Sequence, residues 1–224
     1  MSKLEIDRNE VLRYLGYRNQ SIDEATDKII DQSIEEIGDL MEARYVYKFF
    51  DLKKDDGFLL EGTNLRLGGR DIKGHLAEAD SCIVMGVTLG HRVDRAIRYY
   101  EKLSMARAMI LDACASTAVE AVCDRVNEDL LDMVRVNKRT LTSRYSPGYG
   151  DLSLDMQSPI LDVLGAKGSI GLSATLHNIL IPRKSVTAIM GIVDEDYRQA
   201  DADCIGCPKY DDCSYRKGGG RCGY

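Results

Sequence analysis

The stretch between residues 103 and 136 constrains the fold most, because it contains neither proline nor glycine. Proline breaks a helix and glycine weakens it, so a long run without either favours a continuous helix. The apolar stripe of this run is supplied by Met105, Met109, Ala113, Ala121 and Val122. We therefore predict that residues 103–136 form the longest helix of the chain, with room for one break.

Strand signals flank this helix on both sides in the sequence. Residues 82–90 form a nearly continuous apolar run that ends in glycine, which is typical of a strand covered on both faces. The aromatic segment 45–50 predicts another strand. Residues 172–181 and 185–193 are rich in β-forming residues and are separated by Pro182-Arg183-Lys184, which predicts an antiparallel hairpin. Because helices and strands do not alternate strictly, the predicted fold class is α+β, with a mixed or antiparallel sheet packed against helices.

Shorter helices are predicted from their start signals. Residues 21–24 read as a capping box, and the apolar spacing after them predicts an amphipathic helix of about 20 residues. Residues 76–79 are assigned to a short helix. A further helix is predicted to begin at Ser158, as the N-cap, with Pro159 in the first helical position and Gly165 at its end.

Composition and charge narrow the class of protein. Apolar residues make up 44% of the chain and charged residues 29%, which is normal for a soluble globular protein. The formal net charge is −6 and no block of lysine and arginine dominates an element, so no nucleic-acid partner is expected. The sequence shows no signal peptide and no apolar run that could span a bilayer. We therefore expect a cytoplasmic protein without a membrane partner.

The segment 144–149 combines a fixed cation, a rigid turn and a phenol. Arg144 can bind a carboxylate through two hydrogen bonds, Pro147-Gly148 favours a tight turn, and Tyr149 offers a ring with a polar tip. Such a segment can hold a small zwitterionic ligand. The alternative reading is an ordinary surface turn with an anchoring tyrosine.

Several segments between residues 82 and 197 resemble, in the same order, the activation domain of cobalamin-dependent methionine synthase. The likeness covers about half of the chain. Its segments are Gly86-Val87-Thr88-Leu89-Gly90, the helical residues 108–113 and 118–121, Arg144-Tyr145-Ser146-Pro147-Gly148-Tyr149, Ser169-Ile170-Gly171-Leu172 and Pro182-Arg183-Lys184-Ser185-Val186.

This resemblance implies a function and partners. The family's domain binds S-adenosylmethionine and assists the reductive methylation of cobalamin that has reached the inactive Co(II) state. The chain is too short to hold the homocysteine, folate and cobalamin modules, so the resemblance implies a separate subunit. Its partners would be the catalytic, cobalamin-binding subunit of a methionine synthase and an electron donor such as flavodoxin or ferredoxin.

The resemblance also implies roles for individual residues. Arg144 would bind the methionine carboxylate, Gly148 would let the backbone approach the ligand, and Tyr149 would contact the sulfonium group. Glu120 would receive the ligand's ammonium group, although it also reads as a solvated helix carboxylate. No acid–base residue is implied, because methyl transfer needs positioning of the two ligands rather than proton transfer. The rest of the implied binding segment consists of Tyr145, Ser146 and Pro147.

Four of the seven cysteines lie close together near the end of the sequence: Cys204, Cys207, Cys213 and Cys222. Four thiolates suit an iron–sulfur cluster or tetrahedral zinc. The single Cys-x2-Cys pair, followed directly by Pro208, favours iron–sulfur, with zinc as the alternative. The other three cysteines are predicted to be buried apolar side chains: Cys82, Cys114 and Cys123.

The sequence thus predicts two parts and leaves alternative functions open. Residues 1–198 are assigned to one α+β domain, of which about the first 75 residues match the family poorly, and residues 199–224 to a metal-binding tail. One alternative is a non-enzymatic, zinc-tailed partner or chaperone of a corrinoid protein. The other is a reductive activator of a different corrinoid methyltransferase.

Overall fold

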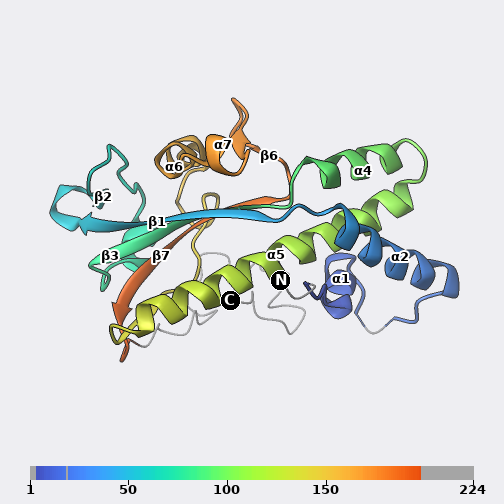
Figure 1. The fold of residues 1–224 in the computed structure, drawn as a ribbon, viewed down its shortest axis with the longest axis horizontal. Helices are drawn as coiled ribbons and strands as arrows, with labels where there is room; N and C mark the ends of the chain where they lie inside the picture. Colours follow the sequence, from blue (N-terminus) through green and yellow to red (C-terminus); the bar gives the residue numbers. More distant parts are fainter. Residues whose placement is uncertain (1–3, 19, 198–224) are drawn as a thin grey trace. The chain divides into compact units, whose positions relative to one another are not determined.

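The computed structural model describes residues 4–18 and 20–197 and is built around a five-stranded sheet (Figure 1). The strand order is β2-β1-β3-β7-β4, and the pairs β1–β2 and β4–β7 are antiparallel. The strands span Arg44–Lys53 (β1), Leu59–Leu60 (β2), Ser81–Thr88 (β3), Arg139–Leu141 (β4) and Ser185–Asp194 (β7). Helices accompany this sheet, and the predicted α+β class is confirmed.

The described residues divide into two compact units, and the division falls within β1, β3, β7 and the helix at Met105–Arg135 (α5). The first unit comprises residues 4–18, 20–48, 85–130 and 157–187. The second comprises residues 49–84, 131–156 and 188–197. The predicted tail, residues 199–224, lies outside the described residues, so the predicted division at residue 198 stays a prediction.

The predicted longest helix is confirmed as α5, Met105–Arg135, which is continuous. Ala113 and Val122 are buried, as their place in the predicted stripe requires. Met105 and Met109 are instead about 60% exposed, so their assignment to the buried stripe is wrong. Small residues such as Ala115 and Ala118 are also buried on this helix. A stripe predicted from large apolar side chains does not include them.

The apolar run before α5 is confirmed as a buried strand. Every residue of β3 after Ser81 is buried, and Gly86 leaves room for the side chain of Leu164, whose Cδ1 would lie 3.4 Å from an added Cβ. The three cysteines outside the tail are also buried, as predicted. Burial raises the pKa of the Cys82 and Cys114 thiols to about 12, so they stay protonated and act as apolar side chains.

The N-terminal helices are α1, Arg8–Tyr14, and α2, Glu24–Leu40. The N-cap of α2 is Asp23, not Ser21 as the predicted capping box has it. The Asp23 carboxylate accepts hydrogen bonds from the backbone N–H of Thr26 (2.9 Å) and from its hydroxyl (2.7 Å). A carboxylate at this position satisfies an otherwise free N–H and interacts favourably with the helix dipole.

Two other helix predictions are displaced along the sequence. Residues 76–79 follow a helix rather than form one, because α3, Arg70–His75, begins where the distant Asp151 caps its first N–H groups. Ser158 is not an N-cap, because α6, Gln157–Leu164, continues from a 3-10 turn at Leu154–Met156. Gly165 ends α6 with a φ of +66°, as predicted, and α7, Ala166–Ser169, follows.

The predicted hairpin between residues 172–181 and 185–193 is wrong. The short strands β5, Ser173–Ala174, and β6, Leu180–Ile181, pair with each other in a separate two-stranded sheet, while β7 belongs to the large sheet. Residues 182–184 do not form a hairpin turn because α4, His91–Glu101, and α5 hold them. Asp94 of α4 accepts from the Arg183 N–H at 2.7 Å, and Lys184 Nζ lies 2.9 Å from Asp112 Oδ2 of α5.

We expect Gly191→Ala to destabilise the protein by about 1–3 kcal/mol, because an added Cβ would lie 2.8 Å from the Cβ of Ala79 and overpack the core. Gly168→Ala is the matched control, since nothing lies within 4 Å of its added Cβ. Urea denaturation of both variants measures the difference. Equal stabilities for the two variants would contradict this description of the core.

Candidate functional site

The predicted binding segment begins where β4 loses its register with β7. Thr142 continues the ladder, because its N–H donates to the carbonyl of Gly191 at 2.9 Å. Tyr145 then exchanges two backbone hydrogen bonds of 2.9 Å with Ile189. Two residues, Ser143 and Arg144, therefore stand opposite the single residue Met190. This is a β-bulge, and a bulge redirects side chains and is often found next to functional sites.

The bulge leads directly into a type II turn at residues 146–149. The N–H of Tyr149 donates to the carbonyl of Ser146 at 3.1 Å, and Gly148 has a φ of +97°. Pro147 pre-sets the backbone at the second turn position, and the positive φ at the third position favours glycine. The Pro-Gly pair of the predicted segment therefore forms the tight turn that the sequence predicts.

A second set of backbone bonds closes the loop after the turn. The N–H of Gly148 donates to the carbonyl of Leu152 at 2.8 Å, and the N–H of Leu152 donates to the carbonyl of Tyr149 at 3.0 Å. An added Cβ at Gly148 would lie 3.1 Å from Leu154 Cδ2. Glycine is thus favoured here both by its backbone angle and by a close neighbour.

The side chain of His75, at the end of α3, supports the bulge from the side. Its Nε2 lies 2.9 Å from the carbonyl oxygen of Ser143, and a carbonyl can only accept, so Nε2 carries the proton. Nε2 also lies 2.9 Å from Thr142 Oγ1, which accepts a 2.8 Å bond from the Gly191 N–H. Burial lowers the pKa of His75, and the bond to Ser143 partly offsets this. The ring is therefore neutral at pH 7.

Aromatic rings continue from His75 to the turn. The rings of His75 and Tyr145 are 5.1 Å apart, and those of Tyr145 and Tyr149 are 6.4 Å apart. The Tyr145 hydroxyl donates to the carbonyl of Tyr149 at 3.3 Å. Burial raises the pKa of Tyr145, and the charges of Asp71 and Asp151 raise it further, so it stays a hydrogen-bond donor. Tyr149 as a whole residue is 54% exposed.

Asp151 connects this loop to the start of α3. Its carboxylate accepts from the N–H of Arg70 at 2.6 Å and from the N–H of Asp71 at 3.0 Å. These two backbone bonds lower the pKa of Asp151. Gly69, with a φ of +121°, makes room for the carboxylate, because an added Cβ would lie 2.6 Å from Asp151 Oδ1. The loop is thus anchored at both ends, by the bulge and by this cap.

The structure places the predicted site residues in two groups. Residues 144–149 lie together in the second unit, where Arg144 is partly buried and Pro147 is buried. Glu120 lies on α5 in the first unit. There its charge adds to burial in raising the pKa of the Tyr14 hydroxyl, so the side chain acts on a neighbouring α1 residue. The site described here is therefore the segment 144–149 and its supports.

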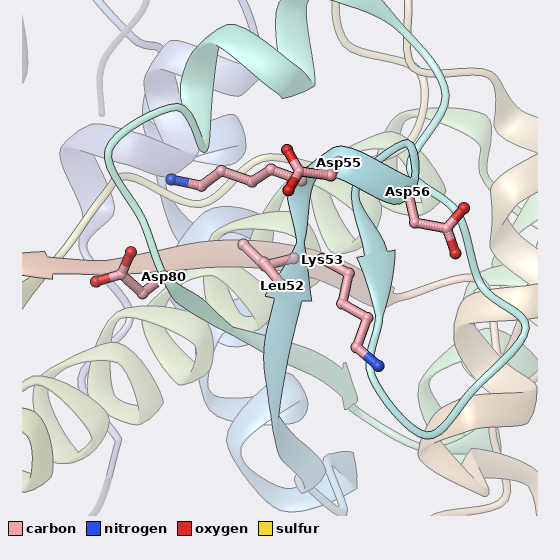
Figure 2. A pocket seen from close by; sticks show the side chains of 6 residues that line it. Leu52, Lys53, Asp55, Asp56 and Asp80 are labelled. Carbon is pink, nitrogen blue, oxygen red and sulfur yellow. The ribbon is translucent and has the colours of Figure 1, made fainter.

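Among the described residues of the second unit, two surface hollows stand out, and neither is lined by a residue of the segment 144–149. One, of about 540 Å³, is lined by Leu52, Lys53, Lys54, Asp55, Asp56 and Asp80. Figure 2 shows that its labelled charged side chains point in different directions rather than toward a common centre. Lys53 is already paired with Glu61 at 2.7 Å. The second hollow, of about 660 Å³, contains Arg139, which is paired with Asp194 at 2.8 Å.

The described part of the chain contains no cluster of three or more histidine, cysteine, aspartate or glutamate side chains placed to hold a metal. The predicted metal ligands, Cys204, Cys207, Cys213 and Cys222, lie outside the described residues. The metal prediction therefore rests on the spacing of those four cysteines. No helix within residues 4–18 and 20–197 is long and apolar enough to cross a membrane.

A solved structure described as the MetH reactivation domain bound to AdoHcy is similar to this chain. The TM-score is 0.60, with 14% sequence identity over 87% of this chain and 75% of that chain. The fold is of the reactivation-domain type. Such a low identity shows the fold alone, and no protein-family description and no curated protein matches the sequence. The expected activation-domain fold is confirmed, whereas the roles of individual residues stay predictions.

Sequence reasoning missed three supports of the segment: His75, Thr142 and Asp151. The glycines beside them, Gly74 and Gly150, are the only local signals, and neither indicates a partner distant in the sequence. Asp151 bonds α3 across 81 and 80 sequence positions, and His75 reaches Ser143 across 68. Only the folded chain brings these groups together.

We expect Asp151→Asn to lower stability in a pH-dependent way. The folded-state pKa of Asp151 is depressed below the unfolded value of about 3.9, so its stabilisation is complete above that pH and is lost as pH falls through the folded pKa. The wild type should exceed the variant in urea denaturation at pH 7, and the gap should close at low pH. Asp162→Asn, an exposed site on α6, is the control that should show no gap. A gap that is constant with pH would contradict the cap.

Proposed function

We propose that this chain binds S-adenosylmethionine through residues 144–149 and assists the reductive methylation of cob(II)alamin on a separate methionine synthase subunit. One observation carries the proposal. The segment that resembles the family's ligand-binding motif forms a fixed turn, directly after a bulge, in a fold shared with a reactivation domain described as bound to AdoHcy.

Arg144 is the proposed partner of the ligand's carboxylate. A guanidinium remains charged at any working pH and can donate to both carboxylate oxygens at once. The bulge supports this role because it places one extra residue in the strand, so that the direction of the Arg144 side chain is not set by the regular ladder. The partly buried position also lowers the local dielectric, which strengthens a charge-assisted bond.

Gly148 and Tyr149 are the proposed contacts beyond the carboxylate. Gly148 has no side chain, so the backbone of the turn can approach a ligand closely. The exposed residue Tyr149 can attract a sulfonium cation through its π face or its hydroxyl oxygen. Ser146 and Pro147 hold the turn, and Tyr145 fixes its end through the bond to the Tyr149 carbonyl. Little conformational entropy then remains to be lost on binding.

The proposed reaction requires this chain only to position the reactants. In the proposed reaction the partner's cobalamin, after reduction by one electron, would supply the nucleophile, and S-adenosylmethionine would supply the methyl group and leave as S-adenosylhomocysteine. The side chains named above would bind the cosubstrate, orient its methyl group and exclude water. Methyl transfer from a sulfonium moves no proton, so the neutral His75 ring and the protonated Tyr145 hydroxyl are not needed for proton transfer. We accordingly assign no acid or base.

Two further parts of the proposal rest on sequence alone. Glu120 is proposed to receive the ligand's ammonium group, as the resemblance implies. The four tail cysteines are proposed to bind an iron–sulfur cluster, with zinc as the alternative, because their thiolates suit either. A low-potential cluster could relay the electron that reactivation consumes. Flavodoxin or ferredoxin is the proposed electron donor.

Arg144→Lys should weaken S-adenosylmethionine binding at least tenfold in calorimetric titration, because an ammonium cannot reproduce the two parallel bonds of a guanidinium. Arg135→Lys is the matched control, since Arg135 is an exposed residue near the end of α5 that pairs locally with Asp132. Circular dichroism should show both variants folded. Unchanged affinity in the folded Arg144 variant would overturn the assignment of the carboxylate partner.

Titration of the wild-type protein with S-adenosylmethionine also distinguishes the alternative functions. A wild-type protein with no affinity for S-adenosylmethionine would favour a non-enzymatic partner of a corrinoid protein. A protein that binds the cosubstrate but reactivates only a corrinoid methyltransferase other than methionine synthase would identify the second alternative.

The tail prediction has its own test. Anaerobically purified protein should be brown, with visible absorbance, and should lose iron and sulfide when the four tail cysteines are replaced by serine. Affinity for S-adenosylmethionine should persist in this variant, because the proposed ligand site lies in residues 144–149. A colourless protein that contains one zinc ion would contradict the iron–sulfur assignment and favour the alternative.

A further inference from the structure

The outward face of α4 is strongly basic, although the whole chain carries a formal charge of −6. Three exposed cations of α4, Arg92, Arg95 and Arg98, and the C-cap residue Lys102 follow one another at helical spacing. Its apolar residues Val93 and Ile97 are buried on the opposite side. Arg92 lies 3.7 Å from Glu42, whereas Arg95, Arg98 and Lys102 form no ion pair among residues 4–18 and 20–197. We call the four cations the basic face.

Large apolar side chains are exposed beside the basic face. Tyr99 of α4, Leu103 of the connecting turn, and Met105 and Met109 of α5 are each more than half exposed. They lie close in sequence around the tight turn between α4 and α5, which Figure 1 shows as the green segment where the two helices meet. Aromatic, methionine and arginine side chains are the residues enriched in protein–protein interfaces. Their presence together indicates a surface for a protein rather than a small ligand.

The neighbouring helix α2 carries the opposite charge on its outward face. Its exposed positions follow helical spacing and include one cation, Lys28, and four carboxylates. These carboxylates are Glu24, Asp31, Glu35 and Asp39. We call them the acidic face. Buried residues such as Ile30 and Ile37 turn to the other side of the helix.

Side-chain contacts fix how α2 and α4 run relative to each other within the first unit. Glu36, in the second half of α2, accepts from the hydroxyl of Tyr100 at the end of α4 at 3.1 Å. Glu42, just after α2, approaches Arg92 at the start of α4. The two helices are therefore antiparallel neighbours, and the acidic and basic faces belong to adjacent elements.

We propose that a second copy of this chain docks on the basic face, with the acidic face of each copy against the basic face of the other. A two-fold axis makes this possible, because it brings α4 of one copy onto α2 of its partner and repeats the contact in reverse. The exposed apolar side chains near the turn add contact area that charges alone do not supply. Each copy of the chain carries both the acidic face and the basic face. A second copy therefore always offers the complementary surface.

Other occupants fit the same observations less well. Four cations on one short helix and its C-cap, in a chain with net charge −6, give a weak footprint for nucleic acid. An anionic membrane would be repelled by the same net charge, and the apolar side of α4 is already buried in the protein. The proposal does not depend on cosubstrate binding, because none of its residues belongs to the segment 144–149.

The test is sedimentation velocity of the full chain with reductant, over a range of protein and salt concentrations. The wild type should dimerise, and added salt should weaken the dimer. In the variant Arg95→Glu/Arg98→Glu, acidic side chains of α4 would face the acidic face of the partner copy. In the variant Glu35→Lys/Asp39→Lys, basic side chains of α2 would face its basic face. Each variant alone should therefore associate at least roughly tenfold more weakly than the wild type. An equal mixture should dimerise again, because both halves of the mixed interface are complementary.

The control is Lys167→Glu/Arg135→Glu, which changes the net charge by the same amount as the α4 variant at exposed sites outside both faces. It should dimerise as the wild type does. A wild type that stays monomeric, a control that dissociates as much as the α4 variant, or a mixture of folded variants that stays monomeric would each overturn the proposal.

Discussion

The single extra residue between Thr142 and Tyr145 is the constraint on which the candidate site depends. Backbone hydrogen bonds on both sides, to Gly191 and to Ile189, keep β4 and the following segment attached to β7, so the extra residue cannot be absorbed by a slip of register. A slip of one residue would turn every side chain of the strand to the other face. The bulge instead confines the change to Ser143 and Arg144, and the chain enters the type II turn from a fixed position.

The turn itself is held by groups that come from elsewhere in the second unit. His75 satisfies the carbonyl of Ser143, and Asp151 ties the loop to the start of α3, so both ends of the turn are fixed before any ligand arrives. A preorganised site loses little entropy on binding, and Tyr149 is already exposed. Under the proposed function, these features would let a short segment with one cation hold a zwitterionic cosubstrate.

The sequence predicts those features that depend on local patterns. The long helix α5 and the buried strand β3 follow from composition and periodicity, and the Pro-Gly turn follows from backbone angles that few residues adopt. Prediction from the sequence fails where contacts between residues distant in the sequence determine the local structure. The hairpin prediction is wrong because Asp94 and Asp112 hold the segment after β6, and the helix at 76–79 is displaced because Asp151 starts α3 earlier. The bulge leaves no local signal, since it appears only when β4 is aligned with β7.

The most direct test truncates the ligand rather than the protein. Calorimetric titration would compare S-adenosylmethionine with 5′-methylthioadenosine, which keeps the nucleoside but lacks both the amino-acid part and the sulfonium charge. S-adenosylhomocysteine, which keeps the amino-acid part and lacks the sulfonium methyl group with its charge, separates the two contributions. The account predicts measurable binding of both amino-acid-bearing compounds and at least tenfold weaker binding of methylthioadenosine, because Arg144 would have no carboxylate to hold. Equal affinity for all three, or none for any, would contradict it.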